Sequence, residues 1–286
     1  MADPVPVTPA APLGLASSSP LSSEVTELLT YFKEKLSAYG EEATEKILSA
    51  AEWARRLHGE QKRASGDPFF IHPLSVASIL VDIHMDDEAV IAALLHDVLE
   101  DTETSRAQLR KEFGRGVETL VQGVTKISVL RGRSRSSQHA ETIRKMLFAM
   151  VKDVRVILIK LADKLHNMRT LGYLDVEDRM RIAKETLDIY APLAGRLGIS
   201  RIKDELEDLS LKHLQPAVYE QIRQFVTDRK SERAEYLERV KEAINGEADG
   251  AGIACFEVRA DPTTSRLRRR HAGQVWRHGR LHHDHL

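Results

Sequence analysis

The chain is poor in several features that decide fold class and cellular setting. Its 286 residues include one cysteine, Cys255, which excludes an internal disulfide and any four-cysteine zinc site. Aromatic residues make up only 5% of the chain, so a core has to be built from aliphatic side chains. No apolar run approaches the roughly 20 residues that span a bilayer. Residues 1–23 also lack the basic segment and apolar core of a signal peptide. We therefore expect a cytosolic protein that does not enter a membrane.

The formal net charge is also close to zero, at -1, but this total is the sum of two parts with opposite charge. Residues 261–286 contain six arginines, two acids and five of the twelve histidines, whereas the rest of the chain carries a net charge of -5. This tail is either a basic arm for RNA or a histidine-rich metal tract, or it is the product of truncation or an out-of-frame reading. We favour truncation or an out-of-frame reading because the tail lacks periodicity and has no lysine among its basic residues.

Helical spacing of apolar residues begins at residue 23 and continues to about residue 245, and convincing alternating strands are absent before residue 252. We therefore predict an all-α fold, preceded by a proline-rich disordered leader over 1–23. We expect Asp86 or Asp87 to cap a helix, Gly114 to end one and Pro192 to kink one. A basic, serine-rich loop is expected over 130–138. The predicted helices cover residues 28–36, 47–57, 73–80, 88–99, 109–113, 140–151, 154–171, 178–197, 200–214 and 216–245.

Four polar residues lie in or directly beside predicted helices whose neighbouring residues are apolar and are expected to be buried. His72 begins a helix, His96 and Asp97 follow Ala92-Ala93-Leu94-Leu95, and Asp163 follows Leu161-Ala162. Charged groups in such places are costly unless they are paired or bind a metal. One divalent cation between the helices would satisfy all four residues, and two imidazoles with two carboxylates suit Mn²⁺, Fe²⁺ or another ion that takes mixed N and O ligands.

Such an ion would lower the pKa of bound water and neutralise phosphate charge. Glu100 and Asp101, which follow four residues after His96 and Asp97, would then orient or deprotonate that water.

Each of these residues also has a plainer interpretation. His72 could be a helix cap, the adjacent histidine and aspartate could bond locally, and Asp163 could pair at the surface with Lys160 or Lys164. The order of histidine, histidine–aspartate and aspartate on separate apolar helices favours the metal site.

That order is the signature of the HD phosphohydrolase superfamily, an all-α fold that uses a divalent metal to cleave phosphate esters. Three segments resemble the hydrolase domain of the RelA/SpoT homologues, which make and degrade the alarmone (p)ppGpp: QKRASGDPFFIHP at 61–73, LLHDVLEDT at 94–102 and LADKLHNMRT at 161–170. The segment YAPLAGRLGI at 190–199 is similar to helices that link hydrolase and synthetase halves in that family. The resemblance covers about residues 25–258.

The resemblance implies an enzyme that removes the 3′-pyrophosphate from (p)ppGpp, usually with Mn²⁺. It implies an alarmone as partner and no binding to the ribosome or RNA, and it leaves the oligomeric state open. Ala64 stands where some members have a second basic residue. The implied roles are metal ligation by His72, His96, Asp97 and Asp163, water activation by Glu100 and Asp101, packing against guanine by Arg63, and lining of the nucleotide pocket by Asn167 and Thr170.

The resemblance also predicts a domain organisation. We expect a hydrolase domain over 24–200, a helical linker with the remnant of a synthetase start over 201–258, and a tail unrelated to the family over 259–286. Synthetase activity is therefore expected to be absent. Two alternatives remain open: a catalytically silent or regulatory fragment, and an HD phosphohydrolase that acts on another nucleotide.

Overall fold

The computed structural model describes residues 23–128 and 152–227, which form helices joined by turns, with no β-strand among them. The all-α prediction is confirmed for these residues. The leader up to residue 22, the loop at 130–138, the helix at 140–151 and everything after residue 227 lie outside the described part. No helix in the described ranges is long and apolar enough to cross a membrane.

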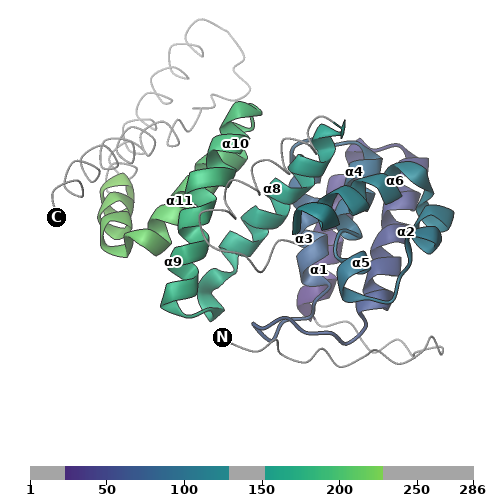
Figure 1. Cartoon of the computed structure of the whole chain (residues 1–286), viewed down its shortest axis with the longest axis horizontal. Helices are drawn as coiled ribbons and strands as arrows, with labels where there is room; N and C mark the ends of the chain where they lie inside the picture. The colour runs from purple at the N-terminus through teal and green to yellow at the C-terminus, as the bar shows by residue number, and fades with distance from the viewer. Residues whose placement is uncertain (1–22, 129–151, 228–286) are drawn as a thin grey trace, which may run out of the picture. The chain divides into compact units, whose positions relative to one another are not determined.

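The chain divides into two compact units at residue 175. Helices of the first unit surround α3, which packs against α1, α4 and α8 (Figure 1). Its elements are α1 (Ser23–Lys35), η1 (Leu36–Ala38), α2 (Glu41–His58), α3 (Ile71–Asp82), α4 (Asp87–Leu94), α5 (Val98–Asp101), α6 (Arg106–Ser128), α8 (Val154–Arg169) and η2 (Leu171–Tyr173).

Helix α3 is buried along most of its length, which fits a sequence that is apolar on all faces. Pro73 is its third residue and so lies in the first turn, where a proline is tolerated because no intrahelical N–H donor is needed. The helix begins two residues before the predicted start. His72 therefore lies inside the first turn and faces the core.

The predicted single helix over 88–99 is wrong, because the chain leaves the helix after Leu94 and starts a new one, α5, at Val98. The capping prediction is confirmed, since Asp86 Oδ1 accepts from the Ala89 N–H at 2.8 Å. At the break, the His96 ring donates from Nδ1 to the Ala93 carbonyl at 2.7 Å. That carbonyl would otherwise accept from the backbone N–H four residues on.

Helix α6 is longer than the predicted helix over 109–113. Gly114 has a non-helical backbone (φ 87°, ψ 173°), so the predicted helix end there is confirmed. A second helical stretch then runs to Ser128 and buries Val117, Leu120 and Val124 against neighbouring helices. The sequence analysis missed this stretch.

The second unit contains α9 (Val176–Glu185), a π-helical turn η3 (Thr186–Tyr190), α10 (Ala191–Arg196) and α11 (Ser200–Leu214), followed by a helical segment at 216–227. The predicted helix over 178–197 is thus interrupted just before Pro192. A proline cannot donate to the carbonyl four residues back. The backbone widens there, and the Ala191 N–H bonds the Thr186 carbonyl five residues back.

Close packing between α6 and α8 gives a stability prediction. A Cβ atom on Gly123 would lie 2.7 Å from Val156 Cγ2, so Gly123→Ala should lower the free energy of unfolding by about 1–3 kcal/mol. Alanine normally stabilises a helix relative to glycine by about 1 kcal/mol. A loss of unfolding free energy in Gly123→Ala would therefore indicate the steric clash. Urea unfolding followed by circular dichroism measures it. Gly172→Ala should be neutral, because no atom of the described residues lies within 4 Å of the new Cβ. Equal stability of both variants would contradict the packing.

Candidate metal centre

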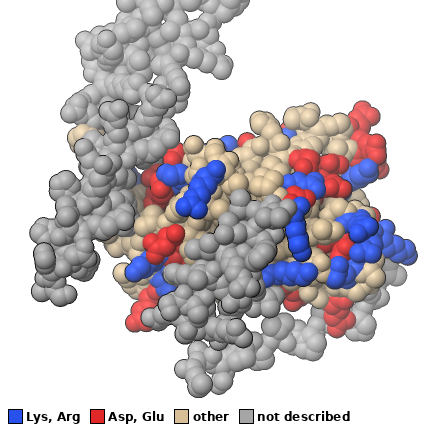
Figure 2. All heavy atoms as spheres, turned by 45° about the horizontal axis from the view of Figure 1, so that its top comes forward, with Lys and Arg blue, Asp and Glu red and all other residues tan. Residues whose placement is uncertain are grey.

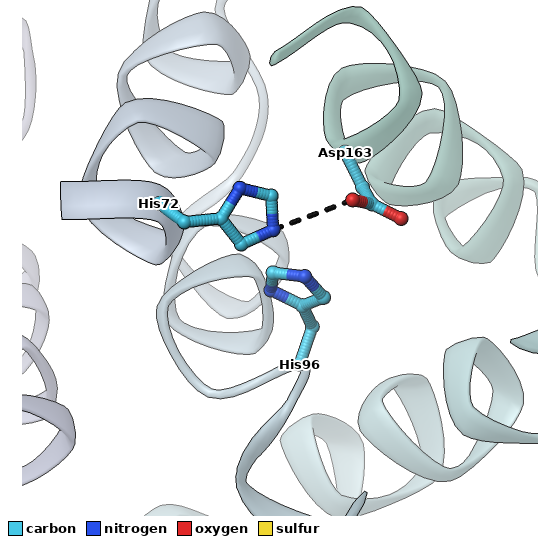
Figure 3. Close-up of side chains that lie close together, drawn as sticks. All are labelled: His72, His96 and Asp163. Atoms are coloured by element: carbon cyan, nitrogen blue, oxygen red, sulfur yellow. Dashed lines mark ion pairs between the residues drawn. The ribbon is translucent and has the colours of Figure 1, made fainter. Parts of the chain in front are cut away.

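Three side chains from distant parts of the sequence converge in the first unit. His72 comes from α3, His96 from the turn after α4, and Asp163 from the middle of α8, and Figure 3 shows them turned toward one another. Each offers a ligand atom, and these atoms lie within 4.8 Å of one another. The exposed fractions are only 3%, 1% and 5%. Three groups able to bind a metal therefore share one buried point.

Asp97, the fourth predicted ligand, lies beside the same point. Its Oδ1 is 3.1 Å from His96 Nε2 and its Oδ2 is 3.6 Å from His72 Nε2. His72 Nε2 is also 3.3 Å from Asp163 Oδ1. The structure thus brings together all four predicted residues, with both imidazole Nε2 atoms facing carboxylates.

The hydrogen bonds of His96 indicate that a cation fits here. Because its Nδ1 faces the Ala93 carbonyl, which can only accept, the ring proton lies on Nδ1. In the neutral ring the Nε2 atom then carries a lone pair, and among the described residues it is buried without a hydrogen-bond partner. The close approach of Asp97 does not satisfy it, since a lone pair and a carboxylate are both acceptors. A cation between them would turn this repulsion into two favourable contacts.

Burial and neighbouring charges set the protonation of the cluster. Burial alone would raise the pKa of the Asp163 carboxyl, but Lys160 Nζ, 2.6 Å from its Oδ2, and the nearby histidines hold that pKa well below its usual range. Burial lowers the pKa of His72, and the Asp163 carboxylate offsets this only in part. A carboxylate and a neutral imidazole are the forms that bind metals.

Lys160 and Asp163 do form the ion pair considered in the sequence analysis, but not at the surface. Lys160 is half-buried beside its buried partner. Although desolvation lowers the pKa of Lys160, the carboxylates of Asp163, Asp97 and Glu100 raise it above its usual value. The pair is therefore part of the cluster.

Arg63 and Asn167, predicted to bind the nucleotide, lie together next to this cluster. Arg63 Nη2 donates to Asn167 Oδ1 at 2.7 Å, and Asn167 Nδ2 donates to Asp163 Oδ1 at 2.6 Å. Gly66, with φ at 92°, shapes the loop that carries Arg63. Thr170 is less available, since its hydroxyl donates to the carbonyls of His166 and Asn167 at the end of α8.

The predicted water-activating residues lie on α5, directly after Asp97. Glu100 and Asp101 are both exposed to solvent. Partial desolvation, and then the negative charge of Asp97, raise the pKa of Glu100. The Asp101 carbonyl accepts from Gln61 Nε2 at 3.3 Å, which ties α5 to the loop after α2.

The sequence analysis missed two buried histidines. His166 Nδ1 lies 2.8 Å from His72 Nδ1, and burial, followed by the charges of His72 and Arg63, lowers its pKa to about 3. His58 stacks on Phe69 with ring centroids 4.4 Å apart, and its buried Nε2 has no hydrogen-bond partner within residues 23–128 and 152–227. The signal for His166 was its spacing of three residues from Asp163 on one helix face.

Comparisons with known proteins cover most of the described chain. Residues 50–200, more than half of the sequence, match the model of the HD domain family. A guanosine-3′,5′-bis(diphosphate) 3′-pyrophosphohydrolase of Haemophilus influenzae is 50% identical over 200 residues, which are 70% of this chain and 30% of that protein. The bifunctional (p)ppGpp synthase/hydrolase SpoT of Escherichia coli K12 is 48% identical over 202 residues, or 71% of this chain and 29% of that protein.

A solved structure described as a metazoan ortholog of SpoT that hydrolyzes ppGpp is 32% identical, covering 50% of this chain and 84% of that one; its TM-score of 0.39 is too low to support an inference. The chain spans less than a third of the length of the two curated relatives. The resemblance to the RelA/SpoT hydrolase domain, predicted from three motifs, is confirmed by these identities. With the family model matched over residues 50–200, the chain belongs to the HD domain family.

Proposed function

We propose that this chain is a metal-dependent hydrolase that removes the 3′-pyrophosphate from (p)ppGpp, giving GDP or GTP and pyrophosphate. The observation that carries the proposal is the buried His72–His96–Asp163 cluster, which lies next to the hydrogen-bonded pair of Arg63 and Asn167. The names of the similar bacterial proteins support this substrate.

The residues proposed to hold a divalent cation are His72, His96, Asp97 and Asp163. We propose Mn²⁺, because mixed imidazole and carboxylate ligands without a thiolate suit it. When bound, such a cation lowers the pKa of water and offsets the charge of phosphate oxygens.

The other residues of the site would position substrate and move a proton. Glu100, with Asp101 beside it, accepts a proton from the water that attacks the phosphorus attached to the 3′ oxygen. The bond between that phosphorus and the 3′ oxygen breaks, the oxygen takes up a proton, and pyrophosphate leaves. Arg63 packs against guanine, and Asn167 and Thr170 line the nucleotide pocket.

The charge pattern on one face of the described residues supports recognition of the substrate by a few local groups. On the face shown in Figure 2, Lys and Arg side chains lie interspersed with Asp and Glu side chains. A mixed surface of this kind attracts a polyanion weakly at long range. We infer that discrimination of the substrate depends on Arg63 and its neighbours at the site.

The domain boundaries stay a prediction. We propose a hydrolase domain over residues 24–200, and the family match over 50–200 supports it. The division into compact units falls earlier, at residue 175, so helices after that point would belong to the domain without belonging to the first unit. The interpretation of the tail at 259–286 concerns residues outside the described part.

The direct test is incubation of the purified chain with ppGpp and Mn²⁺, with anion-exchange separation of the products. We expect GDP and pyrophosphate in equal amounts, and loss of turnover when EDTA removes the metal. Tight binding of ppGpp without GDP formation under any divalent cation would contradict the proposal and favour a silent fragment. Faster hydrolysis of another nucleotide at equal concentration would favour the second alternative.

The same preparation tests the predicted absence of synthetase activity. With ATP and GTP as substrates we expect no pppGpp, and its appearance would contradict the prediction.

A further inference from the structure

His166 has no role in the chemistry proposed above, although it is buried and contacts a proposed metal ligand. We propose that Arg63, acting through His166, holds His72 in the tautomer that leaves its Nε2 atom free to bind a metal. This inference rests on the proposed metal site. It makes His166 a positioning residue and gives Arg63 a task besides nucleotide binding.

The direction of each hydrogen bond follows from Arg63. A guanidinium group can only donate, and Arg63 Nη1 lies 3.5 Å from His166 Nδ1. A proton on His166 Nδ1 would face that N–H group, so we assign His166 Nδ1 as an acceptor. The same atom lies 2.8 Å from His72 Nδ1, so His72 has to donate from Nδ1. A neutral imidazole carries one proton, which leaves a lone pair on His72 Nε2.

The alternative tautomer would be harmful to metal binding. His72 Nε2 lies 3.3 Å from Asp163 Oδ1, so a proton on Nε2 would form a good hydrogen bond to that carboxylate. Without a fixed donor on the far side of His166, the His72–His166 pair could reverse its hydrogen bond and place the proton between two proposed ligands. A metal would then have to displace it. Fixing the tautomer of a ligand histidine from outside is a general device in metal sites.

Arg63 restrains a second proposed ligand in the same way. Its Nη2 donates to Asn167 Oδ1, so the amide of Asn167 has to present Nδ2 to Asp163 Oδ1. Arg63 thus orients residues next to both His72 and Asp163. These bonds use N–H groups in the guanidinium plane and leave its faces open to stack on a base, so both tasks of Arg63 are compatible.

The first test measures Mn²⁺ affinity of the apo protein by titration, with no nucleotide present. His166→Phe removes the acceptor and should weaken Mn²⁺ binding by about 10- to 100-fold, the usual effect of losing such an outer partner. His166→Asn places a carbonyl oxygen where Nδ1 lies and should restore most of the affinity. Arg63→Met should weaken binding by about 10-fold, at the lower end of that range.

The sign of the Arg63→Met effect separates this inference from simple electrostatics. Removing a positive charge near a cation site should tighten binding by Coulomb's law, whereas loss of the tautomer control should weaken it. Lys62→Met is the matched control, since it removes the same charge from the adjacent exposed residue. It should leave Mn²⁺ affinity unchanged or slightly higher. Affinity in Arg63→Met equal to or above that of wild type would overturn the inference.

The second test observes the tautomer directly by ¹⁵N NMR of histidine rings in the metal-free protein. Wild-type His72 should show a protonated Nδ1 and an unprotonated Nε2, and Arg63→Met should shift the proton toward Nε2. A proton on Nε2 of wild-type His72 would overturn the inference even if His166→Phe fails to fold. If wild type binds no Mn²⁺ at all, the proposed metal site itself fails, which is a different outcome.

Discussion

Replacing His96 by asparagine is expected to lower the rate of ppGpp hydrolysis by about 1,000-fold, equivalent to about 4 kcal/mol of lost transition-state stabilisation. The reason is the buried Nε2 atom, which lies 3.1 Å from Asp97 Oδ1 in the cluster and accepts no hydrogen bond from the residues that the structure describes. Asparagine can still donate to the Ala93 carbonyl, as Nδ1 does now, but it cannot reach the cluster. Steady-state kinetics with saturating Mn²⁺ measures the loss.

The matched control is His84→Asn. His84 is exposed, and its left-handed backbone (φ 56°) is one that asparagine tolerates. We expect its hydrolysis rate and melting temperature to match those of wild type. If a folded His96→Asn protein retained more than a tenth of the wild-type rate, His96 would not be a ligand of an essential metal.

Replacing Glu100 by glutamine should lower kcat by about 100- to 10,000-fold, the usual contribution of a positioned general base. Glu100 is exposed, so stability should change by no more than about 0.5 kcal/mol. Mn²⁺ affinity should also stay close to that of wild type, because Glu100 is not a proposed ligand. Glu103→Gln, an exposed neighbour beyond the end of α5, should keep full activity.

The pH dependence of kcat gives Glu100→Gln a second readout. A base works only when deprotonated, so wild-type activity should fall as the pH drops through the pKa of Glu100. Partial desolvation and the charge of Asp97 raise that pKa above its ordinary value of 4.5. The variant should lack this acid limb. If Glu100→Gln kept wild-type kcat while Asp101→Asn lost it, the base would be Asp101.

The four proposed metal ligands could be predicted from the sequence because polar residues stood among apolar ones on separate helices. Burying such groups costs free energy, and one cation bound by all four side chains would compensate for that desolvation. The structure places His72, His96 and Asp163 around that point, with Asp97 beside them.

Other features depended on contacts that the sequence does not display. The apolar spacing of Leu94, Leu95 and Val98 continues a helix, yet the ring of His96 bonds the Ala93 carbonyl and the helix breaks. Lys160 is half-buried and paired with Asp163 because other helices pack around α8. The spacing of His166 from Asp163 does not reveal its 2.8 Å contact with His72, 94 positions away.

The central claim is that one divalent cation binds between His72, His96, Asp97 and Asp163. Anomalous X-ray diffraction at the manganese edge, from crystals grown with Mn²⁺, tests it most directly. We predict a single strong peak at coordination distance from Nε2 of both histidines and from a carboxylate oxygen of each aspartate. Ordered side chains at the cluster with no peak there, or a peak only elsewhere on the chain, would contradict the claim.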